Sequence, residues 1–216
     1  VVGGNGSNTI LGGSGADSIT VASNTAGIDT ILGDNGIVVL NDITQLNSTY
    51  APAAGAVYLQ IKTGLDALGG NDTIVAQDGD KNVFGGFGVD SISVGTGNHV
   101  LVGDNARVDY DAIAFTGRAV VYRTTDVSAS TGGADSITVT GNGNNTILGG
   151  VAGDTISTAS NPTGIDTVLG DNGVVTLNAA DALTGLLAGS VYVQVITNVT
   201  LSDGSGNLDT IGGNDV

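Results

Sequence analysis

The segment GGSGADSIT at Gly12–Thr20 recurs almost unchanged as GGFGVDSIS at Gly85–Ser93. Each copy joins a glycine-rich turn and one aspartate to a short run in which aliphatic residues alternate with Ser or Thr. Glycine adopts turn conformations that other residues avoid, and the alternation of apolar and polar residues is typical of a strand. The nine-residue pattern therefore predicts a short strand after each turn, repeated along the chain.

Longer repeats show the order in which these turns occur. GNGSNTILGG at Gly4–Gly13 matches GNGNNTILGG at Gly141–Gly150, and GIDTILGDNGIVVL at Gly27–Leu40 matches GIDTVLGDNGVVTL at Gly164–Leu177 at the same offset. A more divergent copy lies between them. The alignment defines a unit with a GGxD turn, a full GGxGxD-type turn and a GDN turn, separated by polar turns and followed by a longer excursion.

The repeats divide the chain into units at residues 69–131 and 132–211, flanked by residues 1–68 and 212–216. The sequence GGNDV at 212–216 matches the start of a unit, and residues 1–68 match the part that follows. Joined tail to head, the two flanks form one further unit. We therefore expect one period of a longer tandem array, or a filament of copies joined head to tail, with lateral contacts through the excursions.

The expected fold is all-β: a parallel β-roll or β-solenoid with coils of about 18 residues, two nine-residue repeats each, and β-hairpin excursions between three-turn units. A short helix is conceivable at 179–187. The excursions contain Tyr58, Tyr110, Tyr122 and Tyr192, and we expect the excursions to make lateral or longitudinal contacts. One aliphatic residue of each strand is expected to point inward: Ile10, Ile19, Ile31, Ile74, Val83, Ile92, Val100, Ile137, Ile147, Ile156 and Val168.

The composition excludes several classes of function. The formal net charge is −16, and the only cations are Lys62, Lys81, Arg107, Arg118 and Arg123. We therefore expect no binding to nucleic acid phosphates or to an anionic membrane surface, and the absence of a long apolar run predicts no membrane insertion. Cysteine is absent, so neither disulfides nor thiolate metal sites can form. This suits an extracellular protein in which ions take the place of disulfides.

All 21 acidic residues are Asp, which points to short carboxylates held close to tight turns. Calcium takes six to eight oxygen ligands, and a glycine-rich turn can offer backbone carbonyls beside one carboxylate. One turn supplies half a shell, so we expect sites between turns stacked on one edge of the coils. The candidate ligands on that edge are Asp17, Asp34, Asp72, Asp90, Asp104, Asp135, Asp154, Asp171 and Asp215.

The turns differ in where the aspartate stands. In the GDN turns it comes earlier than in GGxGxD, so Asp34, Asp104 and Asp171 are expected to close or cap a site. The opposite edge is the weaker metal candidate because it carries mostly asparagine. Its polar residues are Asn8, Asn82, Asn98 and Asn145, with Asp29, Asp166 and Asp209 in a few turns.

The pattern resembles the hemolysin-type calcium-binding, or RTX, repeats of secreted bacterial proteins. The resemblance rests on Gly12–Thr20 and Gly85–Ser93, with partial support from GGVAGDTIS at Gly149–Ser157. It implies that Asp17, Asp90 and Asp154 are metal ligands. It also implies export from the cell and folding triggered by calcium outside it.

These observations favour a non-enzymatic, calcium-stabilised structural segment of an extracellular filament, giant adhesin or surface-layer protein, secreted or at the cell surface. Catalysis is disfavoured because the carboxylates recur in every unit, whereas an active site occurs once. The single histidine, His99, stands in the position that Ser18 and Ser91 occupy elsewhere, so we expect its side chain to be solvated.

Three alternatives stay open. The chain could be the calcium-binding accessory roll of an exported enzyme or toxin. It could be a metal-free β-solenoid in which Asn and Asp only cap turns, since asparagine ladders also stabilise such coils. A surface for polysaccharide or ice would need a flat row of outward Thr, whereas the expected outward positions mix Ser, Thr, His and Asn.

Overall fold

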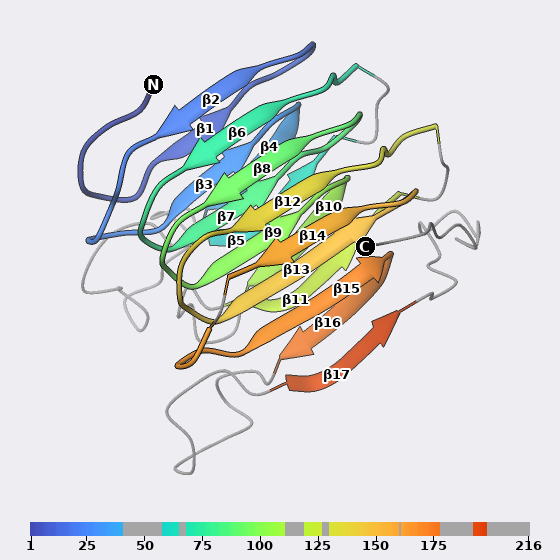
Figure 1. Ribbon diagram of the computed structural model, residues 1–216. Coiled ribbons are helices and arrows are strands. Elements are labelled where there is room, and N and C mark those ends of the chain that lie inside the picture. The colour runs from blue at the N-terminus through green and yellow to red at the C-terminus, as the bar shows by residue number, and fades with distance from the viewer. Residues whose placement is uncertain are drawn as a thin grey trace, which may run out of the picture.

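The computed structural model describes residues 1–40, 58–64, 68–110, 119–126, 130–159, 161–177 and 192–197. These residues form strands in three sheets and contain no helix, so the expected all-β class is confirmed (Figure 1). No described segment is therefore a helix that could cross a membrane.

Two of the sheets are entirely parallel. Sheet A has the order β14-β12-β8-β6-β2, and sheet B has the order β1-β3-β7-β9-β13-β15. Successive strands of one sheet lie one coil apart, as for Thr73 of β6, which pairs with Ser91 of β8. The two sheets thus form a parallel, solenoid-like stack. The strands of sheet A are β2 (Ser18–Val21), β6 (Thr73–Ala76), β8 (Ser91–Val94), β12 (Ser136–Val139) and β14 (Thr155–Thr158). Those of sheet B are β1 (Thr9–Leu11), β3 (Asp29–Leu32), β7 (Lys81–Phe84), β9 (His99–Val102), β13 (Asn145–Gly150) and β15 (Asp166–Asp171).

A thin aliphatic core lies between sheets A and B. Side chains alternate between the two faces of a strand, so each short strand contributes only one or two residues to this core. Most of the predicted inward residues are confirmed in it. Ile19, Ile31, Ile74, Val83, Ile92, Ile137 and Ile147 are buried there, with Ile10 and Ile156 partly buried against them.

Two of the predicted inward residues do not lie in this core: Val100 is buried between sheets B and C instead, and Val168 is exposed. Val100 pairs with Asn82, and it is Leu101, opposite Val83, that enters the core between sheets A and B. Val168 pairs with Ile147 but is 46% exposed. It lies on β15, the last strand of sheet B, while sheet A ends with β14, which leaves no sheet A strand to cover it.

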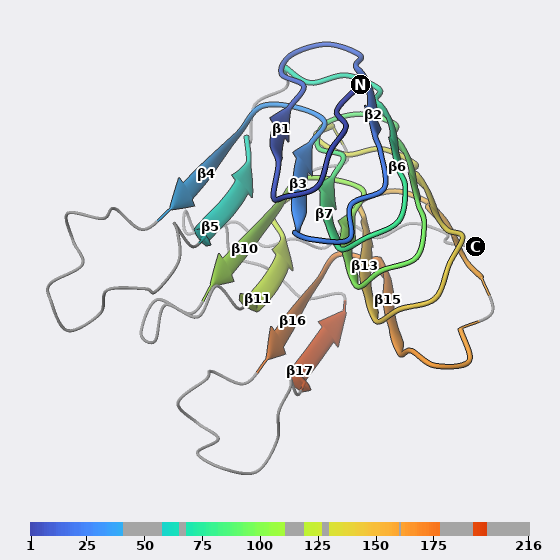
Figure 2. The same ribbon diagram turned by 90° about the vertical axis from the view of Figure 1, so that its left-hand side faces the viewer.

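The excursions form a third, antiparallel sheet C with the order β17-β16-β11-β10-β5-β4. The expected hairpins are confirmed as β4–β5, β10–β11 and β16–β17, yet they do not stand apart from one another. Strand β5 pairs with β10, and β11 pairs with β16, so the hairpins join into one sheet beside the stack (Figure 2). The strands are β4 (Gly36–Leu40), β5 (Tyr58–Thr63), β10 (Ala106–Tyr110), β11 (Ala119–Thr124), β16 (Gly173–Leu177) and β17 (Tyr192–Thr197).

Sheet C covers the second face of sheet B and creates a second core. Phe84 and Leu148 of sheet B pack there with Tyr110 and Tyr122 of sheet C. Both tyrosine side chains are therefore buried within the chain. The side chains of Tyr58 and Tyr192, and the helix considered at 179–187, lie outside the described residues.

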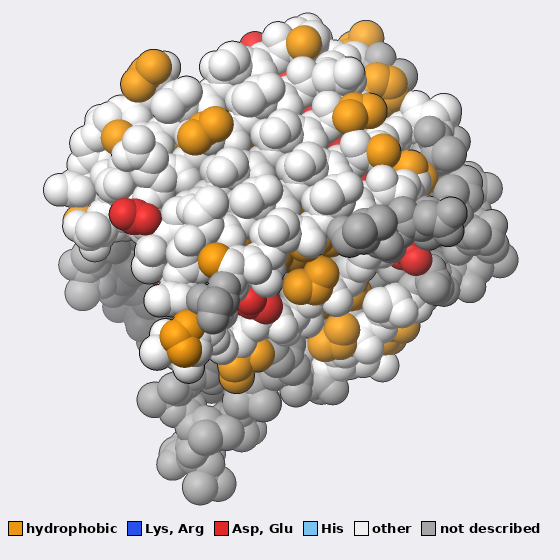
Figure 3. All heavy atoms as spheres, viewed as in Figure 1, with side chains coloured by type: hydrophobic (Ala, Val, Ile, Leu, Met, Phe, Trp, Pro, Cys, Tyr) orange, Lys and Arg blue, Asp and Glu red, His pale blue; other side chains and the backbone are white. Residues whose placement is uncertain are grey.

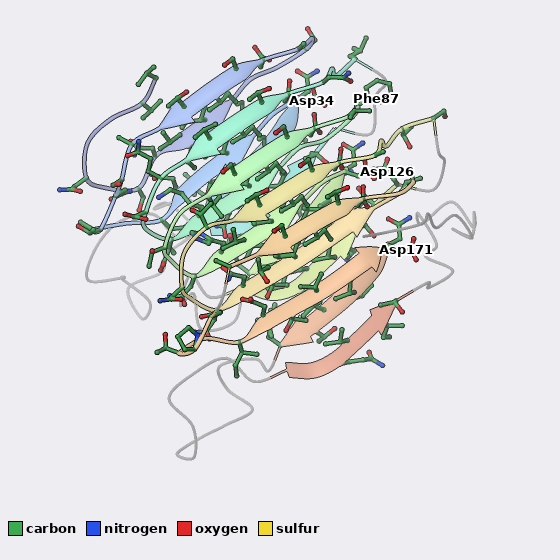
Figure 4. All side chains as sticks on the ribbon, in the orientation of Figure 1. Asp34, Phe87, Asp126 and Asp171 are labelled. Atoms are coloured by element: carbon green, nitrogen blue, oxygen red, sulfur yellow. The ribbon has the colours of Figure 1, made fainter. Side chains whose placement is uncertain are left out.

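The type of turn decides where the chain goes after each strand of sheet B. Full turns follow β1, β7 and β13 and lead into sheet A. GDN turns follow β3, β9 and β15 and lead into sheet C. Both types lie on the same edge of the stack, where Figure 4 labels Asp34 and Asp171 of the candidate metal ligands.

Candidate metal-binding edge

Every strand of sheet A is preceded by an aspartate, and these residues stack on one another. The backbone amide of Asp72 donates to Oδ1 of Asp90 at 2.7 Å, and the amide of Asp90 donates to Oδ1 of Asp135 at 2.7 Å. The same bond joins Asp17 to Asp72 at 2.7 Å and Asp135 to Asp154 at 2.8 Å. We call Asp17, Asp72, Asp90, Asp135 and Asp154 the aspartate ladder. It brings together five of the nine predicted ligands.

The second carboxylate oxygen is left without a partner along most of the ladder. The Oδ2 atoms of Asp17, Asp72, Asp90 and Asp135 are buried and accept no hydrogen bond from the described residues. A buried polar atom without a partner costs about 1–3 kcal/mol, and more when it carries charge. The same unpaired oxygen recurs in successive coils, where it would be a suitable ligand for a cation.

Backbone carbonyls approach these unpaired oxygens at the first glycine of each turn. A Cβ atom at Gly85 would collide with both Oδ2 of Asp90 and the carbonyl of Gly103. At Gly103 it would collide with Oδ2 of Asp135 and the carbonyl of Gly149. At each of these glycines, a carboxylate oxygen and a carbonyl oxygen thus lie side by side, in a space that any larger residue would fill. The same arrangement recurs at Gly12, Gly33 and Gly149.

Burial makes three carboxylates of the ladder, those of Asp72, Asp90 and Asp135, reluctant to ionise without a cation. It raises the pKa of Asp90 to about 8, with a further contribution from repulsion by Asp72 and Asp34. It also raises the pKa of Asp72 and of Asp135 above the ordinary value. Hydrogen bonds from the backbone oppose these shifts but do not cancel them. The ladder therefore needs either bound protons or bound cations to remain buried.

The GDN aspartates are held differently. Asp34 accepts the amide of Gly70 on Oδ1 at 3.0 Å and the amide of Phe87 on Oδ2 at 2.5 Å (Figure 4). Asp104 accepts the amides of Gly133 and Val151 in the same way. Burial still raises the pKa of Asp34 to about 6 and also raises that of Asp104. Both oxygens of each residue are thus bonded to backbone amides of neighbouring turns.

Of the other two predicted ligands, Asp171 and Asp215, the structure describes only the first. Asp171 ends β15 on the same edge, opposite Gly150 of β13, and is half-buried (Figure 4). Asp215 lies outside the described residues.

Asp126 belongs to this edge and was missed by the sequence analysis. Its buried carboxylate accepts the backbone amide of Asn105 at 2.8 Å and the side-chain amide of the same residue at 3.1 Å. Repulsion from it helps to raise the pKa of Asp104 and Asp135. The repeats could not reveal it because it lies in an excursion, although an Asp directly after the strand-like VVYRTT was a usable signal.

On the opposite edge, the carboxylates of Asp29 and Asp166 are paired with side chains of the chain itself. Asp29 accepts side-chain amides of Asn8 at 2.8 Å and Asn24 at 2.9 Å on Oδ1, and it forms an ion pair with Lys81 through Oδ2. Asp166 accepts the equivalent amides of Asn145 and Asn161. The prediction of a weaker metal edge agrees with this pairing.

The prediction of a solvated His99 is wrong. Its side chain is 2% exposed, and Nε2 lies 3.1 Å from the carbonyl of Gly95. Burial lowers the pKa of its imidazole, which favours the neutral form. The error came from the alignment: His99 begins a strand of sheet B beside Lys81 and Asn145, whereas Ser18 and Ser91 begin strands of sheet A.

The outward face of sheet A is therefore more uniform than expected. Its side chains are Ser or Thr at every outward position except Val75. Most of the surface over these strands is accordingly uncharged and polar (Figure 3).

No three acidic or histidine side chains of the described residues converge on one point. A cation on the ladder edge would thus take one or two carboxylates and fill its shell with backbone carbonyls, which calcium accepts. Comparison of the chain with protein-family models, curated proteins and solved structures gives no match.

Proposed function

We propose that this chain is a non-enzymatic, calcium-stabilised structural segment of an extracellular filament, giant adhesin or surface layer, built as an RTX-like β-roll. The observation that carries the proposal is the series of buried, unpaired Oδ2 atoms on Asp17, Asp72, Asp90 and Asp135. Each faces a glycine carbonyl of the following coil, as shown for Asp90 and Gly103. A cation between the two oxygens would turn a repulsive contact into an attractive one.

The donor set favours calcium over other common cations. Carboxylates and carbonyls are hard oxygen ligands, whereas zinc prefers nitrogen and sulfur. Magnesium demands strict octahedral geometry and keeps several waters, which a cradle of two packed oxygens serves poorly. Calcium tolerates irregular shells of six to eight oxygens, and successive turns of the ladder supply carbonyls for such a shell.

A structural role follows from the repetition. The ladder runs the length of sheet A, so ions bound along it would hold consecutive coils in register and stiffen the stack. Each coil contacts mainly its neighbours, and such a stack extends by adding further coils. Val2 pairs in parallel with Val21 of β2, where a further strand of sheet A would lie. We propose that copies join head to tail through such strands.

Calcium content and stability test the proposal together. The protein is freed of metal with a chelator, and its thermal unfolding is followed by circular dichroism with and without added calcium. Bound ions are counted by atomic emission after equilibrium dialysis. We expect about one ion per ladder aspartate and a clearly higher melting temperature with calcium. No bound calcium and an unchanged melt would contradict the proposal.

Assembly is tested separately by electron microscopy of the calcium-loaded protein. Filaments, or rods whose length grows with protein concentration, are expected. Isolated globular particles at all concentrations would count against assembly but not against calcium binding.

A further inference from the structure

Sheet C has one face against sheet B and one face turned away from it. Ile61, Val108, Tyr122 and Val175 point into the shared core. Because successive side chains of a strand alternate, the residues next to them point away from the stack. Arg107 and Arg123 do so, with 39% of each side chain exposed.

The outward face of sheet C carries a straight row of cations. Lys62 pairs with Arg107, and Arg107 pairs with Arg123, so the three stand side by side on β5, β10 and β11. Apolar residues continue the row at both ends, with Ile37 opposite Lys62 and Val174 opposite Arg123. We call Lys62, Arg107 and Arg123 the basic row. It crosses the strands and so runs along the stack, with neighbours about 4.8 Å apart.

This concentration of positive charge is exceptional in a chain of net charge −16. The basic row holds three of the four Lys and Arg residues that the structure describes, and the fourth, Lys81, is fully buried against Asp29. Like charges directly opposite one another on neighbouring strands are destabilising. An arrangement that concentrates them on an exposed face points to an anionic partner.

One carboxylate within the sheet shows how the row binds such a group. Asp109 bridges the two arginines, with Oδ1 at 2.6 Å from Arg107 and Oδ2 at 3.1 Å from Arg123. Gln60 also donates to its Oδ1, at 3.1 Å. One carboxylate for three cations leaves the row positive. Each guanidinium has five N–H donors, so both arginines keep donors for a second carboxylate.

We propose that the basic row binds a linear, carboxylated polysaccharide, which would lie along the row and across the strands. The planar guanidinium matches the geometry of a carboxylate, as the contacts of Asp109 illustrate. Beside the row, Gln60, Thr176 and Gln194 offer uncharged polar groups suited to sugar hydroxyls.

A polysaccharide fits this face better than an acidic protein does. Protein interfaces have buried centres enriched in aromatic residues and methionine. The chain contains no Met or Trp. The row is straight and one residue wide, the shape of a site for an extended chain rather than a globular surface.

Binding of fluorescently labelled oligogalacturonate to the intact, calcium-loaded protein tests the proposal. It is measured by anisotropy at low salt after free calcium has been removed by dialysis, because free calcium would bind the carboxylates of the probe. We expect saturable binding that weakens as salt is added, because salt screens exposed charges. The triple variant K62Q/R107Q/R123Q should bind at least about tenfold more weakly, equivalent to 1.4 kcal/mol. The control T138Q, on the outward face of sheet A, should bind as the unmodified protein does.

A further variant separates binding from stability. Asp109→Asn removes the internal competitor for the arginines, so it should tighten binding severalfold even if it lowers the melting temperature. Weaker or unchanged binding by this variant overturns the proposal. This test does not depend on the triple variant and still decides the question if that variant fails to fold.

Other probes decide between partners. Absence of binding, or equal binding of a neutral glucose oligomer, overturns the proposal. Tighter binding of a sulfated oligomer overturns the choice of carboxylate, and binding of poly-aspartate without oligogalacturonate identifies an acidic protein partner instead. The basic row lies apart from the aspartate ladder, so none of these outcomes depends on the calcium sites.

Discussion

The Lys81 ammonium lies 3.2 Å from Oδ2 of Asp29, and both side chains are completely buried. At this edge of the stack, the cation that neutralises a buried carboxylate comes from the next coil. At the opposite edge, Asp72, Asp90 and Asp135 have no such partner among the described residues. In the part of the chain that the structure describes, buried carboxylates thus have a cationic partner at one edge and lack one at the other. This difference explains why only one edge is proposed to bind calcium.

Lys81→Met should destabilise the protein strongly by leaving Asp29 buried without its partner. Breaking a buried ion pair typically costs about 3–5 kcal/mol. The double variant with Asp29→Asn should recover part of this loss, because asparagine can still accept the amides of Asn8 and Asn24 without a charge. Urea unfolding of both variants measures the effect. Equal stability of the single and double variants would show that the pair is not coupled.

Asp90→Asn should remove one calcium site while keeping the ladder bond. Asparagine retains the Oδ1 acceptor for the amide of Asp72, but its amino group replaces the oxygen that faces Gly103. A site held at a hundred times its Kd contributes about 2.7 kcal/mol. We expect the stabilisation that calcium provides to fall by about that amount, measured as the difference between unfolding with calcium and with chelator.

Asp78→Asn is the matched control. Asp78 accepts the amide of Thr96 at 2.8 Å, also from the next coil, but lies exposed on the opposite edge. The calcium-dependent stabilisation should therefore stay as in the unmodified protein. If both variants lose it equally, the assignment of the metal edge is wrong.

The metal-free protein should become less stable as the pH rises from about 4 to 8. Burial raises the pKa of Asp34 to about 6 and that of Asp90 to about 8, while an unfolded Asp titrates near 3.9. Across this window the folded state binds more protons than the unfolded state, so its stability is greatest at low pH and is lost as these groups ionise.

Calcium should remove or reverse this trend, because metal binding requires ionised carboxylates. Melting temperatures measured from pH 4 to 8, in metal-free buffer and in calcium, test the prediction. A metal-free protein that gains stability as the pH rises would show that the buried carboxylates are already neutralised within the fold.

Phe84→Ala should destabilise the protein by about 3–5 kcal/mol, since it opens a cavity between sheets B and C. Phe87→Ala, in the following turn and only half-buried, should cost much less. The difference should appear both with calcium and with chelator, because this core does not involve the ladder. Urea unfolding of the two variants is the measurement, and equal losses would mean that sheet C is not packed as described.

The stacked parallel sheets could be predicted because the pattern is local. Each strand is specified by a nearby glycine turn and by alternation within four residues, as in Ser18–Val21 and Ser91–Val94. Gathering Asp17, Asp72, Asp90, Asp135 and Asp154 on one edge follows from the same period. The one-residue error at Val100 arose where the unit diverges and a single inward residue had to be chosen from the run HVLV.

The amino-acid sequence by itself determined the all-β class, the stacking period and the edge on which the aspartates gather, because these depend on turns and alternation within one coil. Only the tertiary structure decided that the hairpins join into sheet C, that Tyr110, Tyr122 and His99 are buried, and that Lys81 neutralises Asp29. These features depend on contacts between segments far apart in the chain, which no local pattern specifies.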